Sequence, residues 1–121
     1  MRVAGFGYAS SATIQTLRDA LALAEAQAGP VQALAAPADK TVRLTPLALA
    51  RSLPLIAVFP ADLVAQDTPT RSARSLAARA SGSVAEACAL AAAGPGARLL
   101  RARIISPDHL ATCAIAERTT P

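Results

Sequence analysis

The residues with the clearest capacity for chemistry stand near the start of the chain, where an apolar run meets two glycines and then two serines. Gly5 and Gly7 permit close backbone approach or a positive φ, and Ser10 or Ser11 can cap the helix that should follow. A strand, a glycine turn and a helix N-terminus bring unpaired N–H groups and the helix dipole to one spot, which favours an anion. The same residues also fit an ordinary β–α turn with a helix cap, and this stretch alone favours that simpler interpretation.

Two further polar stretches contain groups that could line an anion site. Asp39 and the only lysine, Lys40, stand side by side in a loop after a predicted strand, and ligands of open α/β sheets bind at the carboxyl ends of strands. Thr70, Arg71 and Ser72 lie in the most polar segment of the chain and can donate to carboxylates. For the first pair the alternative is a solvated turn, which the two residues alone favour. For the second group the alternative is an exposed linker, and both interpretations stay open.

The other reactive side chains have simpler explanations. Ser83 and Glu86 fit the S-x-x-E capping box before an apolar run, so we expect a helix cap there. His109, the only histidine, follows a predicted turn and should be solvated. Cys88 and Cys113 are too few for a zinc cluster, and a disulfide framework is not expected. No convincing nucleophile–base pair is present, so no catalytic residue is assigned, and we expect neither a metal nor a cofactor.

Composition narrows the class of protein. The 121 residues fit one domain over 1–121, and with 53% hydrophobic but only 2% aromatic residues the core should consist of small and aliphatic side chains. The net charge of +4 comes almost entirely from arginine, which suits an anionic ligand but also fits solvated surface arginines. Without a basic run or an aromatic platform we expect no nucleic-acid partner. Without a long apolar run or a signal peptide we expect no membrane association and a cytoplasmic location.

The elements that must position these groups alternate between strands and helices. After the apolar run at the start of the chain, apolar spacing and helix caps predict a helix over 11–28, a strand over 31–35, a helix over 45–52, a strand over 53–59, a short helix over 60–65 and a helix over 84–93. Alternation over 98–105 and 110–116, around a turn at 106–108, predicts a C-terminal antiparallel hairpin. The order indicates an α/β fold: a three-layer α/β/α sandwich with a mixed sheet whose first strands are parallel.

Several segments, in the right order along nearly the whole chain, resemble the CobE/CbiG C-terminal domain family of cobalamin biosynthesis, and its stand-alone CobE branch in particular. These segments are Gly5-Phe6-Gly7-Tyr8, Asp39-Lys40, Leu53-Pro54-Leu55, Asp67-Thr68-Pro69-Thr70-Arg71-Ser72, Gly82-Ser83-Val84-Ala85-Glu86-Ala87 and Ala111-Thr112-Cys113-Ala114-Ile115-Ala116. The family often has a basic residue shortly after the Gly-x-Gly turn, where this chain has Ala9, so any grip on a carboxylate at this turn would come from backbone N–H groups.

The resemblance implies a cytoplasmic role in vitamin B12 (cobalamin) biosynthesis. One hypothesis is a tetrapyrrole-binding protein that holds a precorrin or hydrogenobyrinic-acid-type corrinoid intermediate and hands it on, with other corrin-pathway enzymes as partners. The alternative is an enzyme acting on the precorrin ring, such as a lactone-opening hydrolase of the cobalt-precorrin-5A type. Under the binding hypothesis the ligand should lie over the carboxyl ends of the first strands. The residues expected to bind it are Gly5, Gly7, Tyr8, Ser10, Asp39, Lys40, Thr70, Arg71 and Ser72.

Overall fold

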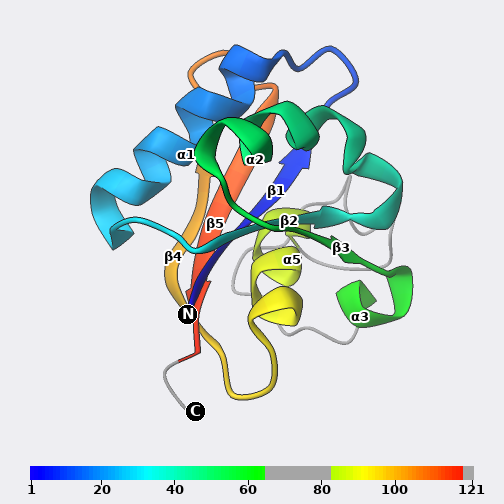
Figure 1. Cartoon of the computed structure of the whole chain (residues 1–121), viewed down its shortest axis with the longest axis vertical. Coiled ribbons are helices and arrows are strands. Elements are labelled where there is room, and N and C mark those ends of the chain that lie inside the picture. The colour runs from blue at the N-terminus through cyan, green and yellow to red at the C-terminus, as the bar shows by residue number, and fades with distance from the viewer. Residues whose placement is uncertain (65–82, 119–121) are drawn as a thin grey trace.

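A mixed five-stranded sheet forms the centre of the computed structural model, which describes residues 1–64 and 83–118 (Figure 1). Its strand order is β3-β2-β1-β5-β4. The strands are β1 (Arg2–Tyr8), β2 (Ala33–Pro37), β3 (Leu55–Val58), β4 (Arg98–Ile105) and β5 (Ala111–Glu117). The first three are parallel, β5 is antiparallel to β1, and β4 is antiparallel to β5. The predicted mixed sheet and C-terminal hairpin are therefore confirmed.

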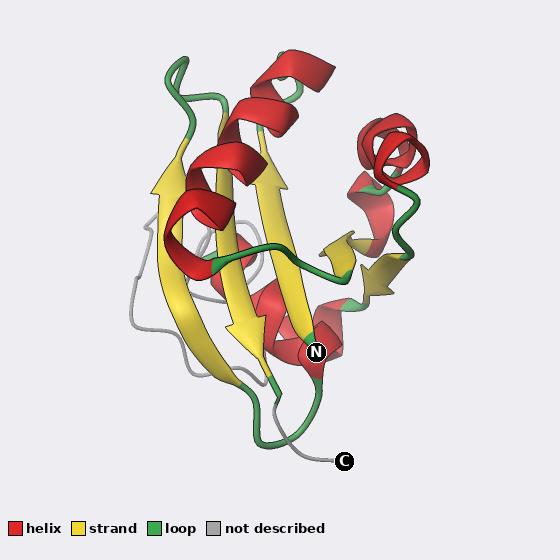
Figure 2. Cartoon of the chain, turned by 60° about the vertical axis from the view of Figure 1, so that its left-hand side comes forward, coloured by secondary structure: helices red, strands yellow, loops and turns green. Residues whose placement is uncertain are grey.

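Helices cover both faces of this sheet. The helices are α1 (Ile14–Ala28), α2 (Thr45–Arg51), α3 (Pro60–Val64) and α5 (Val84–Ala93), with two short 3-10 turns, η1 (Ala38–Lys40) and η2 (Val42–Leu44). The core cluster of one face includes buried residues of α1 and α2, and that of the other face includes buried residues of α5 and α3. Figure 2 shows α1 lying across the central strands. The result is the three-layer α/β/α arrangement that the sequence predicts.

Strand alternation assigns side chains to the two faces. Phe6 and Leu34 belong to the core under α1, whereas Val3 and Ala35 belong to the core under α5. All five residues of β2 are buried, as expected for a parallel strand covered on both sides. In residues 1–64 and 83–118 no helix is long and apolar enough to cross a membrane.

The first helix begins later than predicted. Ala12 N–H donates to Ala9 carbonyl at 3.0 Å, which closes a turn that contains Ser10 and Ser11. The cap is Thr13, whose side chain accepts from the Thr16 amide, while the Thr16 hydroxyl accepts from the Thr13 amide. The prediction that a serine caps this helix is therefore wrong. Ser10 and Ser11 lie in the turn and are too far from Ile14, the first helical residue, to cap the helix. Thr13 directly precedes Ile14 and caps it instead.

Three smaller boundaries also differ from the predictions. The second strand covers Ala33–Pro37 and so begins two residues later than expected. The loop after it winds into η1 and η2. The second helix, α2, covers Thr45–Arg51 and so ends one residue earlier than expected; its N-cap is Leu44, which makes no side-chain cap bond.

The predicted capping box at the start of α5 is only half present. Ser83 does cap the helix, because its hydroxyl accepts from the Glu86 amide at 3.3 Å. The Glu86 side chain is completely buried, and its carboxylate accepts from the Arg103 backbone N–H at 2.9 Å. The pairing of β4 with β5 shifts register between Arg101 and Ile104, so Arg103 lies where the ladder is interrupted. The carboxylate satisfies a strand donor there instead of completing the box.

Candidate functional site

The carboxyl ends of the parallel strands and the β4–β5 turn lie at one edge of the sheet. Tyr8, the last residue of β1, is in register with Ala111, the first residue of β5. The turns η1 and η2 follow the end of β2, and α1 starts from the same edge after β1. We call this region the carboxyl edge: residues 8–13, 38–43, 59 and 106–110. Figure 1 shows the β4–β5 turn and the start of α1 together at the top of the view.

Tyr8 and Lys40 form a reciprocal pair at this edge. The Tyr8 phenol donates to the Lys40 carbonyl, and the Lys40 ammonium donates to the Tyr8 carbonyl at 2.7 Å. The same ammonium lies 5.1 Å from the centroid of the Tyr8 ring, within the range of a cation–π contact. These contacts fasten η1 to the end of β1. The structure thus brings together two predicted site residues that are 32 positions apart in the chain.

Arg43 completes this cluster, and the sequence analysis did not single it out. Its guanidinium donates from Nη1 to the Ala12 carbonyl at 2.6 Å, which joins η2 to the residue before the α1 cap. Burial raises the pKa of the Tyr8 phenol above its usual value, while a hydrogen bond from the Arg43 backbone and the Arg43 charge act in the opposite direction. The phenol therefore stays protonated at neutral pH and keeps donating to Lys40. The spacing of Lys40 and Arg43, one 3-10 turn apart, is a signal that could have found Arg43.

Two other predicted residues lie exposed at the carboxyl edge. Ser10 is exposed in the turn closed by Ala9 and Ala12, shortly before the start of α1. Asp39 is exposed in the middle of η1, beside Lys40. Thus a hydroxyl, a carboxylate and two cationic groups share this edge.

The two glycines of the first motif have different surroundings. A Cβ atom at Gly5 would lie 2.2 Å from the Ala85 carbonyl oxygen and 2.4 Å from the Ala89 nitrogen, both backbone atoms of α5. Gly5 is thus buried in the middle of β1 and is separated from Tyr8 and Lys40. At Gly7 a Cβ would meet the Thr112 hydroxyl at 3.1 Å. This contact is tight, but a side chain can move aside more easily than the backbone of a helix. The predicted residues Thr70, Arg71 and Ser72 lie outside the described residues.

The β4–β5 turn is locked to α1 through Asp108. Its carboxylate accepts from the Thr16 hydroxyl at 2.6 Å, the Ser106 hydroxyl at 2.7 Å and the Leu110 amide at 3.1 Å. The bonds from Thr16 and Ser106 hold the pKa of this carboxyl below its usual value. His109 has a left-handed φ of 64° and is exposed, as expected for a turn histidine.

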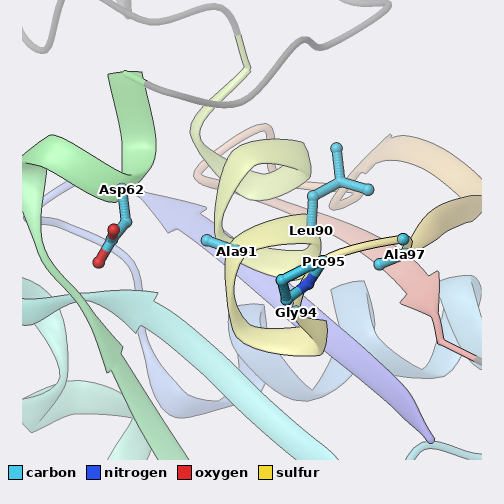
Figure 3. Close-up of a pocket in the computed structure, with 7 residues that line it drawn as sticks. Asp62, Leu90, Ala91, Gly94, Pro95 and Ala97 are labelled. Atoms are coloured by element: carbon cyan, nitrogen blue, oxygen red, sulfur yellow. The ribbon is translucent and has the colours of Figure 1, made fainter.

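A pocket of about 280 Å³ lies elsewhere, between α3, the end of α5 and the loop that leads to β4. Figure 3 shows Asp62 of α3 facing Ala91 across it. Asp62 is the charged residue of its lining, and none of the predicted site residues belongs to it. Within the described residues, no group of three or more His, Cys, Asp or Glu side chains could hold a metal ion.

Comparison with known proteins identifies the family of this chain. A family model described as "Cobalamin synthesis G C-terminus" matches residues 2–116. The crystal structure of CobE, a protein from the cobalamin (vitamin B12) biosynthetic pathway, is 30% identical with a TM-score of 0.87, and the match covers 100% of this chain and 92% of that one. The cobalamin biosynthesis protein chiG from Agrobacterium tumefaciens str. C58 is 33% identical with a TM-score of 0.76, over 99% and 100% of the two chains.

A third structure is similar in fold alone. It is a putative cobalamin biosynthesis protein G homolog from Sulfolobus solfataricus, 18% identical with a TM-score of 0.70, and the match covers 95% of this chain and 36% of that one. No curated protein matches the chain. The match over residues 2–116 and the full-length likeness to CobE agree with the resemblance seen in the sequence, and this chain therefore belongs to the cobalamin synthesis G C-terminus family.

Proposed function

We propose that this protein binds a corrinoid intermediate of the precorrin or hydrogenobyrinic acid type at the carboxyl edge and holds it for processing or handover. Family membership supports the pathway. The observation that carries the proposal is the cationic cluster of Lys40 and Arg43, which is built on Tyr8 and on the residue before the α1 cap. This edge is also where open α/β sheets bind ligands.

The charges of the cluster suit such a ligand. Corrinoid intermediates carry several peripheral carboxylates, and arginine pairs with carboxylates through a planar fork of donors. Arg43 is exposed and uses Nη1 to bind the Ala12 carbonyl, which orients the guanidinium at the edge. Its five N–H groups exceed what this one bond requires. Arg43 is therefore the residue that we expect to contact a ligand carboxylate.

The start of α1 adds a second favourable feature. This helix has 15 residues, and its N-terminus lies at the same edge as Arg43, because Arg43 binds Ala12 directly before the Thr13 cap. The positive end of the helix dipole and the Ser10 hydroxyl thus stand near the guanidinium. Together they would favour a second carboxylate of the same ligand.

Binding is favoured over catalysis by the state of the candidate nucleophiles. Cys88 and Cys113 are both buried in the core. Burial raises the pKa of the Cys113 thiol well above its usual value, so this group stays a thiol at neutral pH. The alternative is a lactone-opening hydrolase, and the experiment must distinguish it from a protein that only binds the intermediate.

Titration of the pure protein with hydrogenobyrinic acid, followed by absorbance and by chromatography of the products, tests this proposal. We expect a spectral change without a new product. Arg43→Ala should weaken binding about tenfold or more, whereas Arg98→Ala, which removes an exposed arginine at the opposite end of the sheet, should not. A new product would support the enzyme, and an unchanged spectrum would contradict the proposal. Arg71→Ala in the same assay tests the prediction for 70–72.

A further inference from the structure

Two large apolar side chains are exposed next to the cationic cluster. Phe59 is 61% exposed and Val42 is 80% exposed. Single exposed apolar residues are common and need no explanation. These two, however, belong to the carboxyl edge, where we place the ligand: Val42 follows Lys40 by two residues, and Phe59 directly follows β3.

The strand register explains how Phe59 reaches this edge. Pro37 is in register with Val58, so the next residue, Phe59, stands beside the first residue of η1. η1 continues to Lys40, and Val42 begins η2. Phe59 therefore stands next to the start of η1, the turn whose last residue is Lys40.

Alternation places Phe59 on the same face of the sheet as Tyr8. Leu55 packs against the core under α1, and Phe59, which directly follows β3, stands four positions later, where continued strand alternation puts it on the same face. Tyr8 packs against the same core. A ligand seated over Arg43 can thus reach Phe59 without crossing the sheet.

Phe59 is the aromatic residue with an accessible side chain. The chain has one tyrosine and two phenylalanines. Phe6 is completely buried, and the Tyr8 ring lies under the Lys40 ammonium with its hydroxyl bound to the Lys40 carbonyl. Phe59 is therefore better placed than Tyr8 to lie against a flat ring ligand.

We infer that Phe59 and Val42 form an apolar shelf that receives the flat, apolar face of the macrocycle while Arg43 holds one of its peripheral carboxylates. The inference rests on the proposed function and specifies how the ligand is oriented. Val42 and Arg43 are adjacent in the chain and offer an apolar surface beside a cation. This combination is complementary to a macrocycle that has an apolar face and carboxylates on its rim. Aromatic side chains stabilise flat apolar ligands by burial and stacking.

The test measures affinity for hydrogenobyrinic acid at several NaCl concentrations for the wild type and for Phe59→Ala, Phe59→Tyr and Leu23→Ala. Phe59→Ala should weaken binding about tenfold at every salt concentration and leave the salt dependence unchanged, since an apolar contact carries no charge. Phe59→Tyr should bind within about threefold of the wild type, because the ring is kept. Leu23→Ala removes an exposed apolar side chain from the middle of α1 and should change nothing.

Folding should not obscure this result. The Phe59 backbone carbonyl accepts hydrogen bonds from the N–H groups of Asp62 and Leu63 in α3. Phe59→Ala keeps this carbonyl. If Phe59→Ala binds like the wild type while Arg43→Ala binds weakly, the shelf is contradicted and the proposed function stands. If the wild type does not bind, both proposals are contradicted.

Discussion

The middle and the end of β1 serve different purposes, although they are only three positions apart. At Gly5 the strand touches the backbone of α5, and this contact leaves no room for a Cβ atom. At Tyr8 the strand ends in hydrogen bonds to η1, next to the exposed Arg43. A motif that looks like one functional unit in the sequence is thus divided between packing and a candidate ligand site.

This difference explains the composition of α5. The helix is made almost entirely of small apolar residues, and Ala85 and Ala89 let its backbone approach β1 closely. Larger residues at these positions would push the helix away and open the core. Substitution of the small residues in the middle of β1 should therefore lower the free energy of unfolding. Substitutions at the carboxyl edge should instead change ligand affinity.

The largest effect should come from Gly5→Ala. The new Cβ would meet two backbone atoms at 2.2 and 2.4 Å, so α5 must move, and overpacking of this severity should cost about 3 kcal/mol of unfolding free energy. Urea denaturation measures it. Gly7→Ala is the matched control and should cost less than about 1 kcal/mol, because its Cβ meets the Thr112 side chain at 3.1 Å. Equal losses at the two glycines would contradict the division of β1.

Glu86→Ala should have the next largest effect on stability. It leaves the Arg103 amide without its buried acceptor, which we expect to cost about 2 kcal/mol. Glu86→Gln keeps an acceptor oxygen and should cost less. Binding of hydrogenobyrinic acid should persist in both variants. An unchanged melting temperature together with lost binding would make Glu86 a site residue instead.

Lys40→Ala should lower both the stability of the fold and the affinity for the intermediate. It removes the bond to the Tyr8 carbonyl and the ammonium over the Tyr8 ring, so the free energy of unfolding should fall by about 1 kcal/mol. Affinity for the intermediate should fall about tenfold, because η1 is released and a positive charge is lost. Calorimetry provides both numbers. A loss of affinity with no change in melting would show that the Lys40 ammonium serves the ligand alone.

The smallest effect should come from Asp108→Asn and should depend on pH. The folded-state pKa of Asp108 is lowered by bonds from Thr16 and Ser106. Its stabilisation is therefore fully present above the unfolded pKa of about 3.9 and is lost as pH falls through the lower folded pKa. Wild-type stability should fall more steeply than that of the variant on acidification below about pH 4. If the stability of the wild type and of the variant fell equally with pH, the stabilising role of the Asp108 carboxylate at the β4–β5 turn would be contradicted.

Much of the fold was predictable because it depends on local patterns. Strand alternation and apolar spacing predicted the layers, and the turn at 106–108 predicted the hairpin. The errors arose where a tertiary contact competed with a local rule. Ser83 and Glu86 satisfy a capping pattern, but an interrupted strand 17 residues away takes the carboxylate. No local pattern encodes that partner.

The candidate site was predictable in outline and not in detail. The rule for carboxyl ends of strands placed Tyr8 and Lys40 at one edge, and the structure brings them together. Phe59 was missed because its relevance depends on exposure and on the β2–β3 register, which a single sequence does not reveal. Arg43 was missed although its spacing from Lys40 points to it, because its partner, the Ala12 carbonyl, is 31 positions away. Gly5 was included because a glycine that admits a helix looks the same in sequence as one that admits a ligand.

Amide chemical-shift mapping of the 121-residue chain during titration with hydrogenobyrinic acid tests the central claim most directly. The account predicts that the largest shifts fall on the carboxyl edge, at Ser10, Lys40, Arg43 and Phe59, and that Gly5 and its α5 neighbours change little. Shifts centred on the pocket lined by Leu90, Ala91 and Ala97 would contradict it and place the ligand at the other end of α5.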